Sequence, residues 1–245
     1  MGIFNDYMRE GKGIDKNPDN RLRIVVFFDI FFRKFWKLVT INLMYIISCI
    51  PIVTIGPATA AVTKLYRNYA REEHAFIWSD FIDTFKKNFL KALAIFFIDL
   101  VLLLLLYFDA SMYLSIEGFG GDALMRVISL AVIMLSATIL LFMNYYIFTL
   151  LITFKLSFKQ LIKNAFIFAW IGFWRNLLIT LIIAAFTLLV AIYFLPVGMV
   201  VTVLIYFSFC GLVINFITYP LIKKHMIDGY DPNTGEKIDE QQKNS

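Results

Sequence analysis

Positive charge is confined to a few short segments of this chain, and the long stretches between them carry almost none. The chain has 23 Lys and Arg residues, yet none lies between Leu177 and Ile222. Between Ala92 and Phe154 there is one, Arg126. These stretches are apolar, and about 20 apolar residues of helix are enough to cross the ~30 Å hydrocarbon core of a bilayer. We therefore predict an all-α, polytopic membrane helical bundle.

Composition supports a lipid environment. Hydrophobic residues make up 60% of the chain, against about 45–50% in ordinary soluble domains. The formal net charge is +5. Because the basic residues flank apolar spans, we expect anionic lipid headgroups to balance this charge, and no nucleic-acid partner. The lipid bilayer is the first partner that the sequence indicates.

Turn-forming residues divide the apolar part of the chain into three hairpins, at about 38–71, 93–154 and 177–221. Each hairpin follows a segment that is both aromatic and basic, and we expect these segments to be amphipathic helices at the membrane interface, at 21–37, 75–91 and 155–176. A single helical membrane domain, 21–222, is thus expected between a polar head, 1–20, and a polar tail, 223–245.

The distribution of charge discriminates between topologies. Eight Lys and Arg residues precede the first hairpin, six lie in 64–91, four in 155–175, four from 223 onward, and one is Arg126. Six passes place 22 of them on one side and one on the other, whereas five passes give 14 and 9. Because basic residues accumulate on the cytoplasmic side, six passes with both termini cytoplasmic are favoured. A re-entrant first hairpin gives the same sidedness without a full crossing.

Helix-breaking residues interrupt the first hairpin at Pro51, Gly56 and Pro57. Proline removes a backbone donor and clashes with the preceding turn, so we expect a reversal of the chain here. Broken helices at membrane depth also form binding sites in transporters. The segment is therefore a candidate site, with an ordinary outer turn as the alternative.

Four polar residues lie inside the apolar stretches and form a candidate intramembrane polar site: Asp99, Asn42, Asn144 and Asn215. A lone carboxyl group among apolar residues is costly unless it is paired or hydrated. Asp99 is thus a candidate for proton or cation transfer. Hydrogen bonding between helices explains the same residues without transport.

Motifs of the common catalytic sites do not occur in the sequence. There is no phosphate-binding G-x-x-x-x-G-K-[ST] loop, no H-E-x-x-H zinc motif and no G-x-S-x-G nucleophile elbow. His74 and His225 lie in polar segments and are expected to be surface residues. We therefore expect no enzymatic activity, no cofactor and no metal site.

Several short blocks are distinctive in sequence: Gly11-Lys12-Gly13, Lys16-Asn17-Pro18, FFRKFWKL at 31–38, IPIVTIGPATAA at 50–61 and REEHAFIWSDFIDTFKKNF at 71–89. Together they cover about residues 11–91 and resemble the YesL-like family of small integral membrane proteins of Gram-positive bacteria, a domain of unknown function. Members are neighbours of carbohydrate ABC importers in gene clusters, so the resemblance implies an accessory role in glycan uptake and a location in the bacterial cell membrane.

Two functions follow as expectations. The first is an accessory subunit that docks on the permease subunits of a carbohydrate ABC importer, with a candidate cytoplasmic docking face made of Arg33, Lys34, Trp36, Lys86, Lys87 and Phe89. The permease itself is not expected, because the conserved Glu-Ala-Ala loop of importer permeases is absent. The second is a small solute or ion transporter that uses Asp99 and the intramembrane amides.

Overall fold

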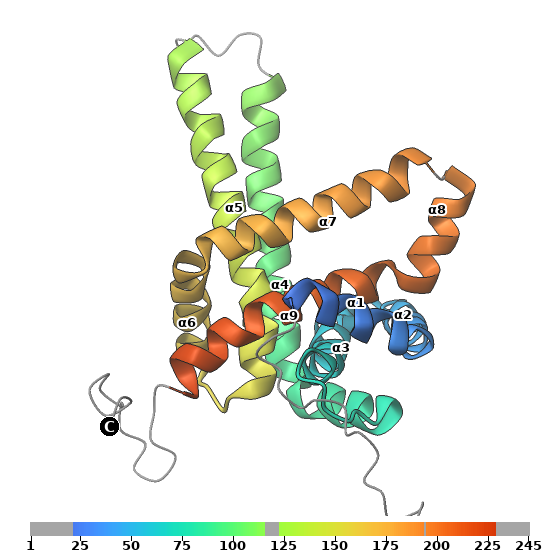
Figure 1. Ribbon diagram of the computed structural model, residues 1–245. Helices are drawn as coiled ribbons and strands as arrows, with labels where there is room; N and C mark the ends of the chain where they lie inside the picture. The colour runs from blue at the N-terminus through green and yellow to red at the C-terminus, as the bar shows by residue number, and fades with distance from the viewer. Residues whose placement is uncertain (1–21, 116–122, 194, 229–245) are drawn as a thin grey trace, which may run out of the picture.

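The computed structural model describes residues 22–115, 123–193 and 195–228, and all regular elements in these ranges are helices (Figure 1). In chain order they are α1 (Arg23–Arg33), α2 (Phe35–Ser48), η2 (Ile52–Thr54), α3 (Ile55–Ala70), α4 (Ile77–Ser115), α5 (Ala123–Thr153), α6 (Phe158–Ile171), α7 (Phe173–Tyr193), α8 (Leu195–Val201), η3 (Thr202–Tyr206) and α9 (Phe207–Met226). η2 is a 3-10 turn and η3 is a π-helical segment. The all-α prediction is confirmed.

Four helices in the described ranges are long and apolar enough to cross a bilayer: Ile77–Leu114, Leu124–Thr153, Phe173–Ala191 and Gly198–Met226. The first two form one hairpin, α4–α5. The other hairpin pairs α7 with the continuous α8–η3–α9 helix (Figure 1). The chain is thus a membrane helical bundle, as its charge pattern predicts.

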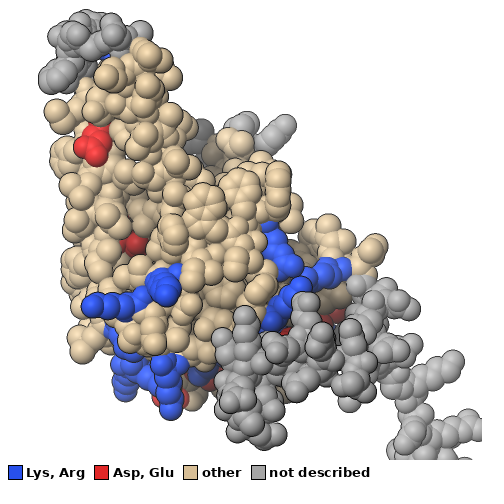
Figure 2. Space-filling model, turned by 90° about the vertical axis from the view of Figure 1, so that its left-hand side faces the viewer, with Lys and Arg blue, Asp and Glu red and all other residues tan. Residues whose placement is uncertain are grey.

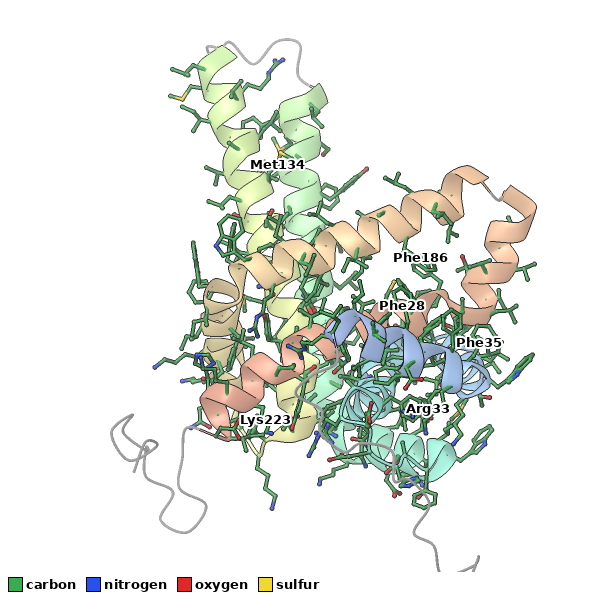
Figure 3. All side chains as sticks on the ribbon, viewed as in Figure 1. Phe28, Arg33, Phe35, Met134, Phe186 and Lys223 are labelled. Atoms are coloured by element: carbon green, nitrogen blue, oxygen red, sulfur yellow. The ribbon has the colours of Figure 1, made fainter. Side chains whose placement is uncertain are left out.

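The outer parts of α4 and α5 project beyond the other helices as a two-helix arm (Figure 1). We define the arm as residues 97–115 and 123–141. Each half is about 28 Å long at 1.5 Å per residue, close to the ~30 Å hydrocarbon core. Large apolar side chains along the arm are exposed, with Leu105 at 56% and Met134 at 72%. Figure 3 shows Met134 on the arm, away from the rest of the bundle.

The first hairpin is shorter than a membrane span, so four helices in the described ranges, rather than the expected six, have the length of a pass. α2 has 14 residues and α3 has 16, which gives about 21 and 24 Å. The turn between them exposes apolar side chains, including Ile50 at 76% and Ile52 at 65%.

Contacts with α4 show where this short hairpin ends. Gly56, in the first turn of α3, lies against Ala92 and Phe96 of α4. Ala92 directly follows Lys91, whose ammonium group donates a hydrogen bond to the Leu156 carbonyl at 2.9 Å. The first turn of α3 therefore lies near the last lysine of α4, at the base of the arm. This geometry matches the re-entrant alternative.

Small residues let α3 and α4 approach closely. A Cβ on Gly56 would overlap the Ala92 carbonyl oxygen and come within 2.8 Å of the Phe96 Cβ. Ala60, one turn further along α3, is fully buried, as is Ala92. At the other end of the pair, the Lys64 ammonium lies 3.0 Å from the Asp80 carboxylate. These contacts hold α3 antiparallel to the first half of α4.

The aromatic and basic segments fold in three different ways. The first forms α1, whose Phe27 ring packs on the rings of Phe209 and Phe216 of α9, with centroids 6.0 and 5.4 Å apart. The second is not a separate helix, because α4 continues without a break from Ile77 into the membrane span. The third begins α6 with a capping box, in which Ser157 and Gln160 satisfy each other's backbone N–H groups.

The ends of the membrane domain differ slightly from the expected boundaries. α9 continues to Met226, past the expected end at residue 222, so Lys223 and Lys224 belong to its last turn. The polar head, most of the polar tail and the turn at 116–122 lie outside the described residues.

Lys and Arg side chains gather at one end of the molecule, which we call the basic end (Figure 2). Figure 2 shows Lys and Arg gathered on the lower part of one face, while the arm above is almost free of them. All four tryptophans of the chain are exposed, at 56–79%: Trp36, Trp78, Trp170 and Trp174. Each lies near the end of a helix, and Trp36 and Trp174 directly precede Lys37 and Arg175. Tryptophan near basic residues is typical of a membrane–water interface.

Candidate functional site

Asp99 lies at the base of the arm, on the side of α4 that faces α5. It lines a cavity of about 330 Å³ between α3, α4 and α5. Asn144 of α5 lines the same cavity, and its amide donates a hydrogen bond to the Leu140 carbonyl at 3.1 Å. The structure thus brings together two of the four predicted polar residues.

The remaining walls of this cavity are mostly apolar. Gly56 and Thr59 come from α3 and Phe96 from α4, and further α4 and α5 residues complete the lining: Leu100, Leu103, Ala137, Leu140, Leu141 and Phe148. The Thr59 hydroxyl donates to the Ile55 carbonyl at 2.8 Å. No Lys or Arg of the described chain lines the cavity. The Asp99 carboxyl group is therefore its one ionisable group.

A second cavity, of about 170 Å³, adjoins the first and shares Thr59, Asn144 and Phe148 with it. Asn215 of α9 lines this second cavity together with the hydroxyl groups of Tyr45, Thr63, Tyr66, Tyr145 and Thr149. A third predicted residue therefore lies in the same polar region. The two cavities together extend from Asp99 into the centre of the bundle.

A chain of hydrogen bonds leads from Asn215 toward the basic end. The Thr149 hydroxyl donates to the Asn215 side-chain oxygen at 3.1 Å, and the Thr153 hydroxyl donates to the Thr149 carbonyl at 2.5 Å. Arg67 Nη1 in turn donates to the Thr153 hydroxyl at 3.0 Å. The place of Arg67 between α3 and α5 had no signal in the sequence, because it depends on how these two helices pack.

Asn42 is fully buried but belongs to a different part of the molecule. Its amide Nδ2 donates to the carbonyls of Thr202 and Val203 in η3, at 3.1 and 2.6 Å. Its Oδ1 accepts from the Ser208 backbone N–H at 3.0 Å. A π-helical segment interrupts the regular i→i+4 pattern and leaves backbone groups to be satisfied by other partners. Asn42 thus satisfies backbone groups at the bend of the last helix and does not line either cavity.

The segment with Pro51, Gly56 and Pro57 forms a compact turn. Pro51 is exposed and precedes η2, and the Thr54 hydroxyl donates to the carbonyls of Ser48 and Pro51, at 2.5 and 2.6 Å. Gly56 and Pro57 are buried in the first turn of α3. Only Gly56 contributes to the cavity at Asp99. The residues therefore reverse the chain and let α3 pack closely on α4.

The candidate docking face is divided between two places. Arg33 pairs with Asp29 at 3.6 Å and with Glu72 at 3.9 Å. Lys34 lies over the Tyr69 ring, 5.4 Å from its centroid, and burial, together with Lys37 and Arg33, lowers its pKa. Trp36 is 79% exposed next to them.

The other half of the candidate docking face is on α4. Lys86 and Lys87 are exposed and form no ion pair with any described residue, while Phe89 is half-buried and its ring packs at 5.6 Å on that of Phe85. No hydrogen bond, ion pair or ring contact among the described residues joins the two halves.

The described residues contain no group of three or more His, Cys, Asp and Glu side chains that could hold a metal ion. The polar region at Asp99 instead offers one carboxyl group, amides and hydroxyls in a mostly apolar cavity. Such a lining suits hydrogen bonding or the binding of a cation.

Comparison with curated proteins and with solved structures found no match. A comparison with family models found one for the part of the chain that holds the short hairpin and most of α4. Residues 38–110 match the family described as "Protein of unknown function, DUF624".

Proposed function

We propose that this chain is a non-catalytic membrane subunit that assembles with the permease subunits of a carbohydrate ABC importer. The docking role rests on one observation: the large apolar side chains of the arm are not covered by other described parts of the chain. The carbohydrate importer as partner follows from the resemblance of residues 11–91 to the YesL-like family.

The arm has the character of a surface for partner helices. None of the residues in the most apolar stretch of α5 is buried within the described structure, and 11% of those in α4 are. The arm also exposes polar groups, among them the Asp109 carboxyl and the hydroxyls of Ser136 and Thr138. Polar and ionisable groups are costly against lipid tails, and they stabilise association when neighbouring helices cover them.

The basic end supplies a second surface in this proposal. Lys86, Lys87 and Trp36 are exposed there, and basic aromatic surfaces contact lipid headgroups or acidic segments of a partner. The bilayer is the bacterial cell membrane, and both termini are cytoplasmic. The charge count supports this orientation, because four passes with a re-entrant first hairpin still leave 22 of the 23 basic residues on one side.

Site-specific photo-crosslinking in native membranes tests the docking role. A photoreactive amino acid is placed at Met134 on the arm, and in a separate variant at Leu188 on α7. The two positions are matched, because their side chains are 72% and 58% exposed and both lie on apolar helices. We expect crosslinks from Met134 to a permease subunit of a carbohydrate importer, identified by mass spectrometry, and none from Leu188.

Two results would contradict the docking proposal. One is that Met134 crosslinks only to lipid or to a second copy of this chain. The other is that the tagged full-length chain copurifies with no permease subunit from native membranes in any of several mild detergents.

A second candidate function is transport of a small solute or ion, and the adjoining cavities favour it. They place Asp99, Asn144 and Asn215 in one polar region, and hydrogen bonds continue from Asn215 to Arg67. The chain reconstituted in vesicles should then show flux of a monovalent cation or small solute that Asp99→Asn reduces. Equal flux in vesicles with the wild-type chain, with the variant and without protein would exclude this function.

A further inference from the structure

The cavity beside Asp99 combines a single carboxyl group with a predominantly apolar and aromatic lining. Its other polar side chains, Asn144 and Thr59, are neutral, and no Lys or Arg of the described residues lines the cavity. An ionised carboxylate in such surroundings is stabilised by a cation that enters the cavity. Charge complementarity therefore points to a positively charged ligand.

The lining also indicates which kind of cation. Inorganic alkali and alkaline-earth ions need a shell of several oxygen atoms. Here the polar side chains are those of Asp99, Asn144 and Thr59, and the Thr59 hydroxyl is already engaged with the Ile55 carbonyl. The other lining groups are aliphatic or aromatic, with Phe96 and Phe148 on the walls. Aromatic faces attract organic ammonium groups, and apolar walls accommodate their hydrocarbon part.

The size of the cavity agrees with an organic ligand. Its volume of about 330 Å³ lies at the lower end of the range for small-molecule sites, about 300–1,000 Å³. Gly56 lets α3 pack directly on α4 at Ala92, so that Thr59 of α3 and Asp99 of α4 line the same cavity.

We propose that this cavity binds an amphipathic organic cation, with a substituted ammonium group at the Asp99 carboxylate and an apolar body against Phe96, Phe148 and the leucines. The site goes beyond docking on an importer and requires no transport. It also gives the ligand class on which the second candidate function would act.

Binding is tested on the purified full-length chain in lipid nanodiscs, with benzyltrimethylammonium as the probe and neopentylbenzene as its neutral isostere. Equilibrium dialysis measures both against empty nanodiscs, so that partitioning into lipid is subtracted. We expect saturable binding of the cation to the wild-type chain, at least about tenfold tighter than binding of the isostere, which corresponds to about 1.4 kcal/mol.

Matched variants localise the binding. Asp99→Asn keeps the shape of the side chain and removes its charge, and should weaken cation binding about tenfold. Asp109→Asn removes the same charge ten residues further along α4, at an exposed position outside the cavity, and should leave binding unchanged. Ala137→Leu fills the cavity from α5 and should abolish binding of the cation while Asp99 stays intact. Circular dichroism and size-exclusion chromatography verify that each variant is folded.

Three results would overturn the proposal. Equal binding of the cation and the isostere would show that charge does not contribute to binding. Equal binding by the wild-type chain and Asp99→Asn would show that the cation does not bind at Asp99. Displacement of the probe by millimolar K⁺ or Na⁺ in the wild-type chain would assign the site to an inorganic ion. The binding assay uses the purified chain without a partner and without flux. A negative result would therefore reject the cation site and leave the docking proposal untouched, because photo-crosslinking tests docking separately.

Discussion

The Asn42 side-chain oxygen accepts a hydrogen bond from the Ser208 backbone N–H at 3.0 Å, across 166 positions of the chain. The contact ties α2 to α9 immediately after the π-helical segment. The Ser208 hydroxyl donates a hydrogen bond to the Leu38 carbonyl of α2 at 2.7 Å and lies 3.0 Å from the Tyr66 hydroxyl. The short first hairpin is thus joined by buried polar contacts to the bend of the last membrane helix.

Asn42→Leu should destabilise the folded chain. The substitution leaves the Thr202 and Val203 carbonyls and the Ser208 N–H without the partner that Asn42 provides. An unsatisfied buried polar group costs about 1–3 kcal/mol, so we expect a loss of about 2 kcal/mol and a lower Tm in detergent. Thr40→Ala on the same helix is the control, because its hydroxyl bonds only to the Trp36 carbonyl. An unchanged Tm for Asn42→Leu would show that the bend does not depend on this residue.

Gly56→Val should separate α3 from α4. Even the Cβ of the new side chain would overlap the Ala92 carbonyl oxygen, which is backbone and cannot turn away. Overpacking of a close contact costs about 1–3 kcal/mol. Urea unfolding in mild detergent measures the change. Ala94→Val adds bulk at an exposed position two residues from Ala92 and should stay within about 0.5 kcal/mol of the wild-type chain. Equal stability of the two variants would argue against the close α3–α4 contact.

Cysteine labelling tests the depth of the first hairpin. In a background with Cys49 and Cys210 replaced by alanine, Leu124→Cys at the end of the arm should react with a membrane-impermeant thiol reagent added outside intact cells. Lys224→Cys should react only after lysis. Ile52→Cys should also fail to react from outside, because Gly56, four residues further along, lies against Ala92 and Phe96 at the base of the arm. Labelling of Ile52→Cys from outside in intact cells would instead establish six passes.

Ser157→Ala should weaken the start of α6. The Ser157 hydroxyl accepts from the Gln160 N–H at 3.4 Å, and the Gln160 side chain accepts from the Ser157 N–H at 3.0 Å. Loss of such a cap typically costs about 1 kcal/mol. Hydrogen exchange of the first turn of α6 should accelerate accordingly. Ser136→Ala, whose hydroxyl bonds to the Val132 carbonyl of its own helix, should leave this exchange unchanged, and the same acceleration in both variants would refute the capping role.

Local sequence features account for much of the fold. Apolar runs of about 20 residues predict α4, α5, α7 and α9, because the transfer of a helix into lipid depends on its own composition. Pro51 and Pro57 likewise predict the reversal at the tip of the first hairpin, since proline restricts its own turn. The continuation of 75–91 into α4 has a local cause as well, because α4 contains no proline or glycine that would break the helix between Lys91 and Leu93.

The candidate polar site was predictable only in part. The unusual character of Asp99 is visible in the sequence, because a carboxyl group among apolar residues is costly anywhere in a span. The sequence did not indicate which amide lies near Asp99, because Asn42, Asn144 and Asn215 were equally suitable. In the structure, Asn144 lines the same cavity as Asp99, and Asn215 lines the adjoining cavity. Asn42 instead donates a hydrogen bond to the Val203 carbonyl at the bend of the last helix.

The sequence by itself determined that this chain has runs long and apolar enough to cross a membrane and that its Lys and Arg residues lie almost entirely outside those runs, because the cost of moving a side chain into lipid depends mainly on that side chain. Only the tertiary structure decided which polar groups meet. Thr59, Asp99 and Asn144 come from three helices, and their convergence depends on the approach of α3 to α4 at Gly56 and Ala92. Such contacts arise from the shapes of packed surfaces, which no single segment of the chain encodes.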